Sequence, residues 1–456
     1  MAVIIAYLIQ YTLQPTSNKC TRFKELGRTQ NNVFRVKKML YLNRRCFGCV
    51  RCSQKQVNPR QLVGLPKSVD WSQEQLNRDE NNDTKTLPCA RSLIISEPWL
   101  NKRFVVLGIE TSCDDTGVAI VDSSGRILGE TRVGQEAIHS KWGGVVPALA
   151  RDAHDEAITR CIDGCLKQAN LSVSQLDAIA VTMGPGLELC LRVGFESGRN
   201  VAASYHLPFV SIHHLEAHCL MARLFFEDIT FPFLNVLVSG GHCQLILCKG
   251  VGEFLVLGGT LDDAMGEAYD KVARLLGLAS GGGGGALVEQ LAKDGNADAF
   301  HLPVPMSKTK DMNFSFAGLK TAVSLLVRDL GGTEILKECP QLRSDVAASF
   351  QKVCYLHLHE KTQRALEWCI ENEKNTKYLV LSGGVARNES IRSCCQQLAE
   401  KFRLQFAVAP PEWCTDNGVM TAWAGIERLR LGIQDDMKEI DVQARWPIGK
   451  FYQGLQ

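Results

Sequence analysis

The chain has 456 residues, of which 45% are hydrophobic, 22% are charged and 7% are aromatic. This length suffices for two or three domains with substantial cores, and the composition is ordinary for a folded protein. The formal net charge is only +2, which excludes attraction of nucleic acid by the overall field. A nucleic-acid partner would therefore need a local basic patch.

The positive charge is concentrated at the N-terminal end. Residues 1–100 contain 16 Lys and Arg against 7 Asp and Glu, whereas the remainder contains 35 against 42. An Arg-rich, acid-poor leader is typical of an organellar transit peptide. Its opening apolar run, MAVIIAYLIQYTL, is too short to span a bilayer. We therefore expect a mitochondrial transit leader over residues 1–69, a polar Asn/Asp-rich linker over 70–103, and residence in the mitochondrial matrix without a membrane anchor.

From residue 104 onward, strand signals alternate with helical periodicity. Residues 104–122 and 233–250 each read as two apolar strands joined by a polar or glycine-containing turn, which predicts two β-hairpins. Residues 377–392 predict a strand that enters a helix, with Asn388 near its start. Apolar residues recur at three- and four-residue intervals over 150–169, 270–278 and 345–370, which predicts helices. This order indicates an α/β protein with mixed sheets, and the recurring hairpins favour a duplicated, two-lobe architecture with a cleft between the lobes.

The hexapeptide HHLEAH at residues 213–218 could bind a metal ion. On a helix, His214 and His218 lie about 40° apart around the axis, so both rings can reach one ion. Glu216 would lie about 200° from His214, which disfavours the general base of an HExxH metallopeptidase. His213 points about 100° away and is left out. The third candidate ligand is Asp416, although the histidine pair can also be purely structural and Asp416 can also cap the following helix.

Glycine turns give a second signal. The stretches VSGGH (238–242) and SGGV (382–385) both follow strands, and backbone N–H groups at such turns can approach an anion closely. Asp270 is expected to begin a helix, where it could cap that helix or bind a ribose hydroxyl. The glycine-rich tract at 281–285 could be a flexible loop or a ligand contact, and residues 313–322 read as a loop entering a helix.

Several of these segments, taken together, resemble one family. They occur in the order found in the tRNA N6-adenosine threonylcarbamoyltransferases, the TsaD/Kae1 family, and with the basic leader they resemble its mitochondrial member. The match covers roughly residues 104–431. The segments are GIETSCDDTGVAIVD, GGVVPALARDAH, GPGLELCLRVG, HHLEAH, LVSGGHCQL, DDAMGEAYDKVARLLGL, FSFAGLKTA, SGGVARN and CTDNGVMTAWAG.

The resemblance implies an actin/hexokinase/Hsp70-like duplicated fold, with a first lobe over 104–220 and a second over 221–456. It implies transfer of a threonylcarbamoyl group from threonylcarbamoyl-AMP to N6 of the adenosine just 3′ of the anticodon in mitochondrial tRNAs that read ANN codons. The product is t6A, and a separate synthase would supply the adenylate to a homodimer. Two other classes stay open: a metallopeptidase, and an actin-fold ATPase or kinase.

The resemblance also implies site residues. One divalent ion per subunit, of zinc, iron or manganese, would be held by His214, His218 and Asp416. The general base is not identified by the sequence. The adenylate would be held by Leu237, Val238, Ser239, Gly240, Gly241, Asp270, Gly285, Glu289 and Asn388.

Overall fold

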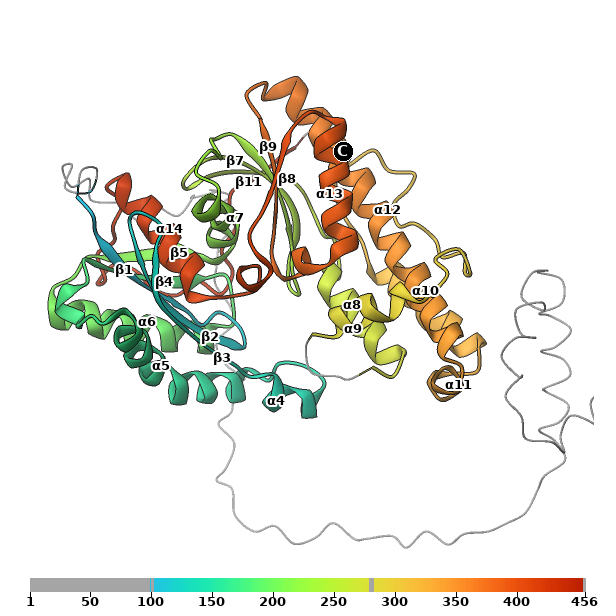
Figure 1. Ribbon diagram of the computed structural model, residues 1–456, viewed down its shortest axis with the longest axis horizontal. Helices are drawn as coiled ribbons and strands as arrows, with labels where there is room; N and C mark the ends of the chain where they lie inside the picture. Colours follow the sequence, from blue (N-terminus) through green and yellow to red (C-terminus); the bar gives the residue numbers. More distant parts are fainter. Residues whose placement is uncertain (1–98, 100–101, 279–282, 454–456) are drawn as a thin grey trace, which may run out of the picture. The chain divides into compact units, whose positions relative to one another are not determined.

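The structure is a computed structural model that describes residue 99 and residues 102–278 and 283–453 (Figure 1). The expected leader and nearly all of the expected linker lie outside these described residues. Within the described part of the chain, no helix combines the length and the apolar character that a membrane crossing requires.

The first sheet is formed by the predicted N-terminal hairpin and three further strands. β1 (Val105–Glu110) pairs antiparallel with β2 (Asp115–Asp122), and β2 pairs antiparallel with β3 (Ile127–Gly134). β4 (Ala178–Gly184) and β5 (Phe209–His213) continue in parallel from β1, which gives the order β3-β2-β1-β4-β5. The hairpin predicted over residues 104–122 is confirmed.

Both faces of this sheet are buried. Leu107 and Ile109 of β1 join the apolar cluster under α5 (Pro147–Ala169), whereas Val106, one residue along the strand, joins the cluster on the opposite face. This alternation follows from the two-residue period of a strand. α6 (Glu188–Tyr205) packs on β4 beside α5, while α14 (Gly418–Arg430) packs on β1, β2 and β4 from the other side (Figure 1).

The second sheet repeats this topology. β6 (Phe233–Val238), β7 (Cys243–Gly250) and β8 (Glu253–Gly259) form an antiparallel meander. β9 (Tyr378–Ser382) is parallel to β6, and β10 (Gln405–Val408) is parallel to β9. A short strand, β11 (Lys450–Phe451), extends the edge at β8. Apart from β11, both sheets have the same order and strand directions, which confirms the predicted duplication and the hairpin over 233–250.

The remaining described helices lie in the connections between strands. The predicted start of one of them was wrong: the helix expected to begin at Asp270 begins at Met265, because buried Met265, Ala268 and Tyr269 extend the apolar face of Val272 by more than a turn. Asp270 therefore does not cap its own helix. This helix is α8 (Met265–Leu275). The others are α4 (Glu136–His139), α7 (His214–Phe225), α9 (Gly284–Lys293), α10 (Ala317–Asp329), α11 (Thr333–Glu338), α12 (Pro340–Asn372) and α13 (Glu389–Lys401).

Helix α14 links the C-terminal part of the chain to the first sheet. A Cβ on Gly418 would lie 2.4 Å from the backbone nitrogen of Ala119 in β2, and a Cβ on Gly108 in β1 would lie 2.3 Å from the backbone nitrogen of Ala422. Glycine at these positions lets the helix backbone touch the strands directly. The lobe boundary expected at residues 220 and 221 stays a prediction, and the contact of α14 with the first sheet crosses it.

Candidate metal centre and glycine turns

The structure brings the three predicted metal ligands together. His214 and His218 lie on the first two turns of α7, and Asp416 lies in the loop before α14. The Nε2 atom of His218 is 3.0 Å from Oδ1 of Asp416, and the Nε2 atom of His214 is 3.8 Å from the same oxygen. All three ligand atoms lie within 4.8 Å of one another. Two imidazole nitrogens and one carboxylate oxygen in this arrangement fit a transition-metal ion.

Asp416 does not cap α14. The cap is the next residue, Asn417, whose Oδ1 accepts a hydrogen bond from the backbone N–H of Met420 at 2.9 Å. Asn417 Nδ2 also donates to the backbone oxygen of Thr415 at 2.7 Å, which closes the loop. The alternative reading of Asp416 as the helix cap was therefore wrong, and its carboxylate faces the histidines instead.

The neighbouring residues of the hexapeptide have structural roles. His213 caps α7, because its Nδ1 accepts from the backbone N–H of Leu215 at 3.1 Å. Glu216 points away from the histidines, as predicted. Its carboxylate accepts from Arg428 Nε at 3.1 Å and from the backbone N–H of Gly252 at 2.9 Å. A glutamate held in this way does not supply the general base of a metallopeptidase beside His214.

The buried charges at this cluster stabilise one another. Burial opposes the charging of His214, but the Glu110 and Asp416 carboxylates outweigh it and raise the pKa of the ring to about 9. Burial would raise the pKa of Asp416, yet the charges of His214 and His218 hold that pKa well below its usual range. His242, whose ring centroid is 6.1 Å from that of His214, has its pKa lowered to about 4 by burial. The cluster therefore places buried carboxylates beside the imidazole rings, and an ion bound there would displace a ring proton.

The sequence interpretation missed two acids at this cluster. Glu110, at the end of β1, is fully buried, and its Oε2 lies 3.2 Å from Nδ1 of His214. Asp115, at the start of β2, has its pKa raised to about 7 by burial and then by the nearby Asp416 and Asp114 carboxylates. An acid that ends an otherwise apolar strand is a signal that could have found Glu110, because an unpaired charge is rarely buried.

The first predicted glycine turn lies next to this cluster. Leu237 and Val238 are buried in β6, which leads directly into the turn. Ser239 closes the turn, since its Oγ accepts from the backbone N–H of His242 at 3.0 Å. A Cβ added to Gly240 or Gly241 would meet no described atom within 4 Å. These two glycines therefore border open space.

The second glycine turn touches the first. Gly383 has a φ of +88°, and a Cβ there would lie 2.3 Å from the backbone oxygen of Val238. This contact follows from the parallel pairing of β6 with β9, which brings the carboxyl ends of both strands to one edge. A Cβ on Gly384 would lie 3.5 Å from Cγ2 of Thr415, the residue before Asp416. The two turns and the Asp416 loop thus meet at one end of the second sheet.

The other predicted adenylate contacts join three helices. Asp270 Oδ1 accepts from the backbone N–H of Gly285 at 3.2 Å, and Glu289 Oε1 accepts from the backbone N–H of Glu389 at 2.6 Å. Asn388 caps α13, as its predicted place near the helix start indicated. Asp270 thus connects the middle of α8 to the start of α9, and Glu289 connects the middle of α9 to the start of α13. α8 in turn reaches the first glycine turn, because Gly266 N–H donates to the backbone oxygen of Ser239 at 3.1 Å.

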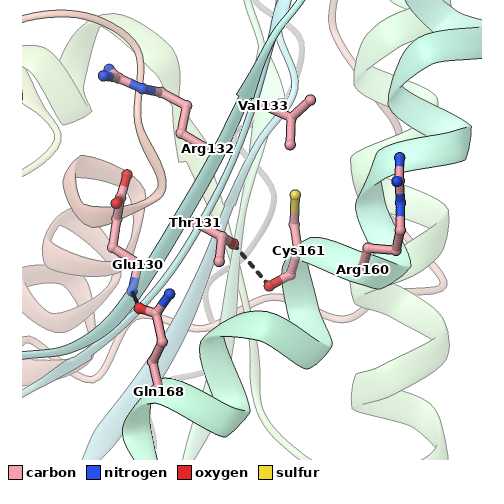
Figure 2. Close-up of a pocket in the computed structure, with 7 residues that line it drawn as sticks. All are labelled: Glu130, Thr131, Arg132, Val133, Arg160, Cys161 and Gln168. Atoms are coloured by element: carbon pink, nitrogen blue, oxygen red, sulfur yellow. Dashed lines mark hydrogen bonds between the residues drawn. The ribbon is translucent and has the colours of Figure 1, made fainter.

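A surface cavity of about 580 Å³ lies elsewhere, between β3 and α5 (Figure 2). In this view Thr131 of β3 is directed toward Cys161 of α5, to whose backbone oxygen it donates at 2.8 Å. The lining of this cavity contains none of the predicted site residues. Arg132, which also lines it, donates to Thr415 Oγ1 at 2.7 Å and so connects this surface to the Asp416 loop. We do not place the substrate in this cavity.

Comparison with known proteins identifies the family. Residues 126–423 match the family described as TsaD: tRNA N6-adenosine threonylcarbamoyltransferase. The chain is 45% identical over 379 residues to a probable tRNA N6-adenosine threonylcarbamoyltransferase, mitochondrial, of Arabidopsis thaliana, covering 79% of this chain and 78% of that protein. It is 44% identical over 341 residues to the mitochondrial protein of the same name from Xenopus tropicalis, covering 72% and 84%. Among solved structures, HypF of T. kodakarensis is similar with a TM-score of 0.44 and 17% identity, over 72% of this chain and 48% of that one. The chain therefore belongs to the tRNA N6-adenosine threonylcarbamoyltransferase family, TsaD.

Proposed function

We propose that the protein transfers a threonylcarbamoyl group from threonylcarbamoyl-AMP to N6 of the adenosine just 3′ of the anticodon in mitochondrial tRNAs that read ANN codons. The products are t6A in the tRNA and free AMP. The family membership supports the reaction. The observation that carries the site is the convergence of His214, His218 and Asp416 beside two glycine turns.

In this proposal, His214, His218 and Asp416 hold one divalent ion, with zinc, iron and manganese all compatible with the donor set. When bound, such an ion supplies Lewis-acid stabilisation of negative charge that develops on substrate oxygens. Three protein ligands leave coordination positions open for those oxygens. The close spacing of the three ligand atoms supports the assignment.

The glycine turns would hold the adenylate. A Cβ on Gly240 or Gly241 would meet open space, and we propose that the backbone N–H groups of these residues bind the phosphate there. Leu237, Val238 and Ser239 would contribute through the backbone and by shaping the turn. Asp270, Gly285, Glu289 and Asn388 stabilise the helix ends around it, so that their contacts with the adenylate would add to, or exchange with, their present hydrogen bonds.

The reaction requires mainly that the protein align the adenine amine with the carbamoyl carbon. The mixed anhydride of threonylcarbamoyl-AMP is already activated, because AMP is a good leaving group. The adenine N6 attacks the carbamoyl carbon, the bond from that carbon to the phosphate oxygen breaks, AMP leaves, and the amine loses one proton. Fixed N–H donors and the neighbouring buried charges stabilise the charge that develops, without reorganisation at the moment of reaction.

The same proposal includes the partners and the compartment. We infer that a separate synthase makes the threonylcarbamoyl-AMP, that the protein acts as a homodimer, and that it works in the mitochondrial matrix after removal of the leader over residues 1–69. The relatives named mitochondrial, and the basic composition of residues 1–100, support the location.

The test is reconstitution from purified parts. Wild-type protein is incubated with threonylcarbamoyl-AMP and unmodified tRNA, and the nucleosides are analysed by mass spectrometry. We expect t6A with wild type and with His301→Ala, which alters an exposed histidine, and none with His218→Ala or Asp416→Asn. Formation of t6A at the wild-type rate by Asp416→Asn would contradict the proposed site. Rapid ATP turnover without tRNA, or chelator-sensitive cleavage of casein, would instead favour an ATPase or a peptidase.

A further inference from the structure

A buried carboxylate lies directly behind one of the proposed metal ligands. Glu110 is fully buried at the end of β1, and its Oε2 lies 3.2 Å from Nδ1 of His214. Thr182 Oγ1 donates to the same oxygen at 2.6 Å, and the backbone N–H of Ser112 donates to Oε1 at 2.7 Å. Removing a carboxylate from water is costly unless such partners surround it. These partners hold the Glu110 carboxylate at hydrogen-bond distance from the His214 ring.

This contact selects one tautomer of His214. An ionised carboxylate only accepts hydrogen bonds, so Nδ1 of His214 must carry the proton that it donates to Glu110. Ser112 Oγ is also 3.2 Å from Nδ1, and a hydroxyl accepts as readily as it donates. A metal ion that displaces the second ring proton would therefore bind at Nε2, which is the nitrogen 3.8 Å from Asp416 Oδ1.

The hydrogen-bonded chain continues to the helix that follows Asp416. Thr182 Oγ1 lies 3.0 Å from Oγ1 of Thr421, which is on the first turns of α14. β1, β4, α7 and α14 are thus connected by four side chains: Glu110, Thr182, His214 and Thr421. All four side chains are buried, so their hydrogen bonds form away from water. They connect a histidine on α7 with the helix next to the third ligand.

We propose that Glu110 is a positioning residue that orients His214 for metal binding, with Thr182 and Thr421 connecting it to the helix after Asp416. The inference rests on the metal site proposed above and concerns residues to which that site assigns no role. Carboxylate partners behind a ligating histidine fix the ring and its tautomer, and their removal typically weakens metal binding about 10- to 100-fold.

Glu110→Gln is the direct test. A glutamine keeps the shape of glutamate but replaces one carboxylate oxygen by an NH₂ group. In one orientation this group faces the Ser112 N–H, and in the other it faces the donors of Thr182 and His214. Either way, two hydrogen-bond donors face each other and a contact is lost. The matched control is Glu216→Gln, which also alters a buried carboxylate, on α7 itself, but one bonded to Arg428 and Gly252. Both variants are checked for folding by circular dichroism before metal binding is measured.

The measurement is titration of the metal-free full chain with Co²⁺, followed by visible absorption, together with Zn²⁺ affinity from competition with a chelator. We expect wild type and Glu216→Gln to share one affinity and one spectrum, and Glu110→Gln to bind about 10- to 100-fold more weakly with an altered spectrum. If Glu110→Gln does not fold, Thr182→Val, which keeps the carboxylate and loses one donor, should still show a weaker affinity of about tenfold.

Each outcome decides between the two proposals. If the wild-type protein binds no metal ion, or if it binds one that the His218→Ala variant binds equally well, the metal site and this inference both fail. If wild type binds an ion that His218→Ala removes while Glu110→Gln, or Thr182→Val in its place, keeps the wild-type affinity and spectrum, only the positioning role fails. A purely structural role for Glu110 would lower the thermal stability and leave the Co²⁺ spectrum of the folded protein unchanged.

Discussion

The contact of α14 with the first sheet gives a quantitative prediction for Gly418→Ala. The new Cβ would lie 2.4 Å from the backbone nitrogen of Ala119 and equally close to the carbonyl carbon of Val118, whereas ordinary contacts begin at about 3.4 Å. Both obstacles are backbone atoms of β2, so they cannot rotate away. The start of α14 must therefore retreat by about 1 Å, and Asp416, two residues earlier, moves with it.

Two effects of different size should follow. Overpacking of this kind destabilises a core by about 1–3 kcal/mol. A displacement of about 1 Å between groups that act on one substrate costs about 100-fold in rate, so kcat/KM for t6A formation should fall much further than the folded fraction does. The control is Gly318→Ala in α10, where a Cβ meets nothing within 4 Å and where alanine favours the helix.

The assay for both variants is single-turnover t6A formation with threonylcarbamoyl-AMP, at a temperature where circular dichroism shows them fully folded. We expect the Gly318→Ala rate to match wild type. If Gly418→Ala loses thermal stability but keeps the wild-type kcat/KM, then the close approach of α14 to β2 does not position Asp416, and our reasoning about the site is wrong.

Three further predictions concern other parts of the molecule. Prolonged chelation should abolish t6A formation, and addition of Zn²⁺, Fe²⁺ or Mn²⁺ should restore it; full activity in metal-free protein would contradict the site. Burial lowers the pKa of His357 from about 6.5 in the unfolded chain to about 4 in the folded protein. The stability that the neutral ring contributes is therefore complete above about pH 6.5. About 3 kcal/mol of it is lost as the pH falls toward 4. His357→Gln, whose side-chain oxygen can accept from Ser315 N–H as His357 Nε2 does, should flatten urea-derived stability over that pH range, and an unchanged slope would count against it. Lys361 is fully buried and donates to Thr309 Oγ1 and to the backbone oxygen of Asp311, each at 3.0 Å. Lys361→Met should therefore lower the free energy of unfolding by about 3 kcal/mol. A loss of less than about 1 kcal/mol would refute this prediction.

Local patterns predicted the elements well. The pairs of apolar runs joined by a short turn in 104–122 and 233–250 were enough to place both hairpins, because strand pairing across a short turn is a local property. The four-residue spacing of His214 and His218 likewise predicted their shared face on α7. The start of α8 was misplaced because Met265 and Ala268 continue its apolar face, a signal that only their burial reveals.

Long-range contacts could not be predicted from the residues alone. Asp416 and Asn417 are adjacent short polar residues before the same helix, and only tertiary packing decides that Asn417 caps α14 while Asp416 faces His218. Glu110 was missed for the same reason, since its partner His214 lies 104 residues away in the chain. Asp416 was a candidate ligand from the residues and from the family resemblance. Glu110 carried only the weaker signal of an acid at the end of an apolar strand, which does not reveal its histidine partner.

The most direct measurement is a crystal structure of the protein grown with Co²⁺ or Zn²⁺, with anomalous diffraction recorded at the metal edge. Our account predicts one strong anomalous peak per chain, bonded to Nε2 of His214, Nε2 of His218 and a carboxylate oxygen of Asp416. A strong peak bound by other residues, with these three side chains unligated, would contradict it.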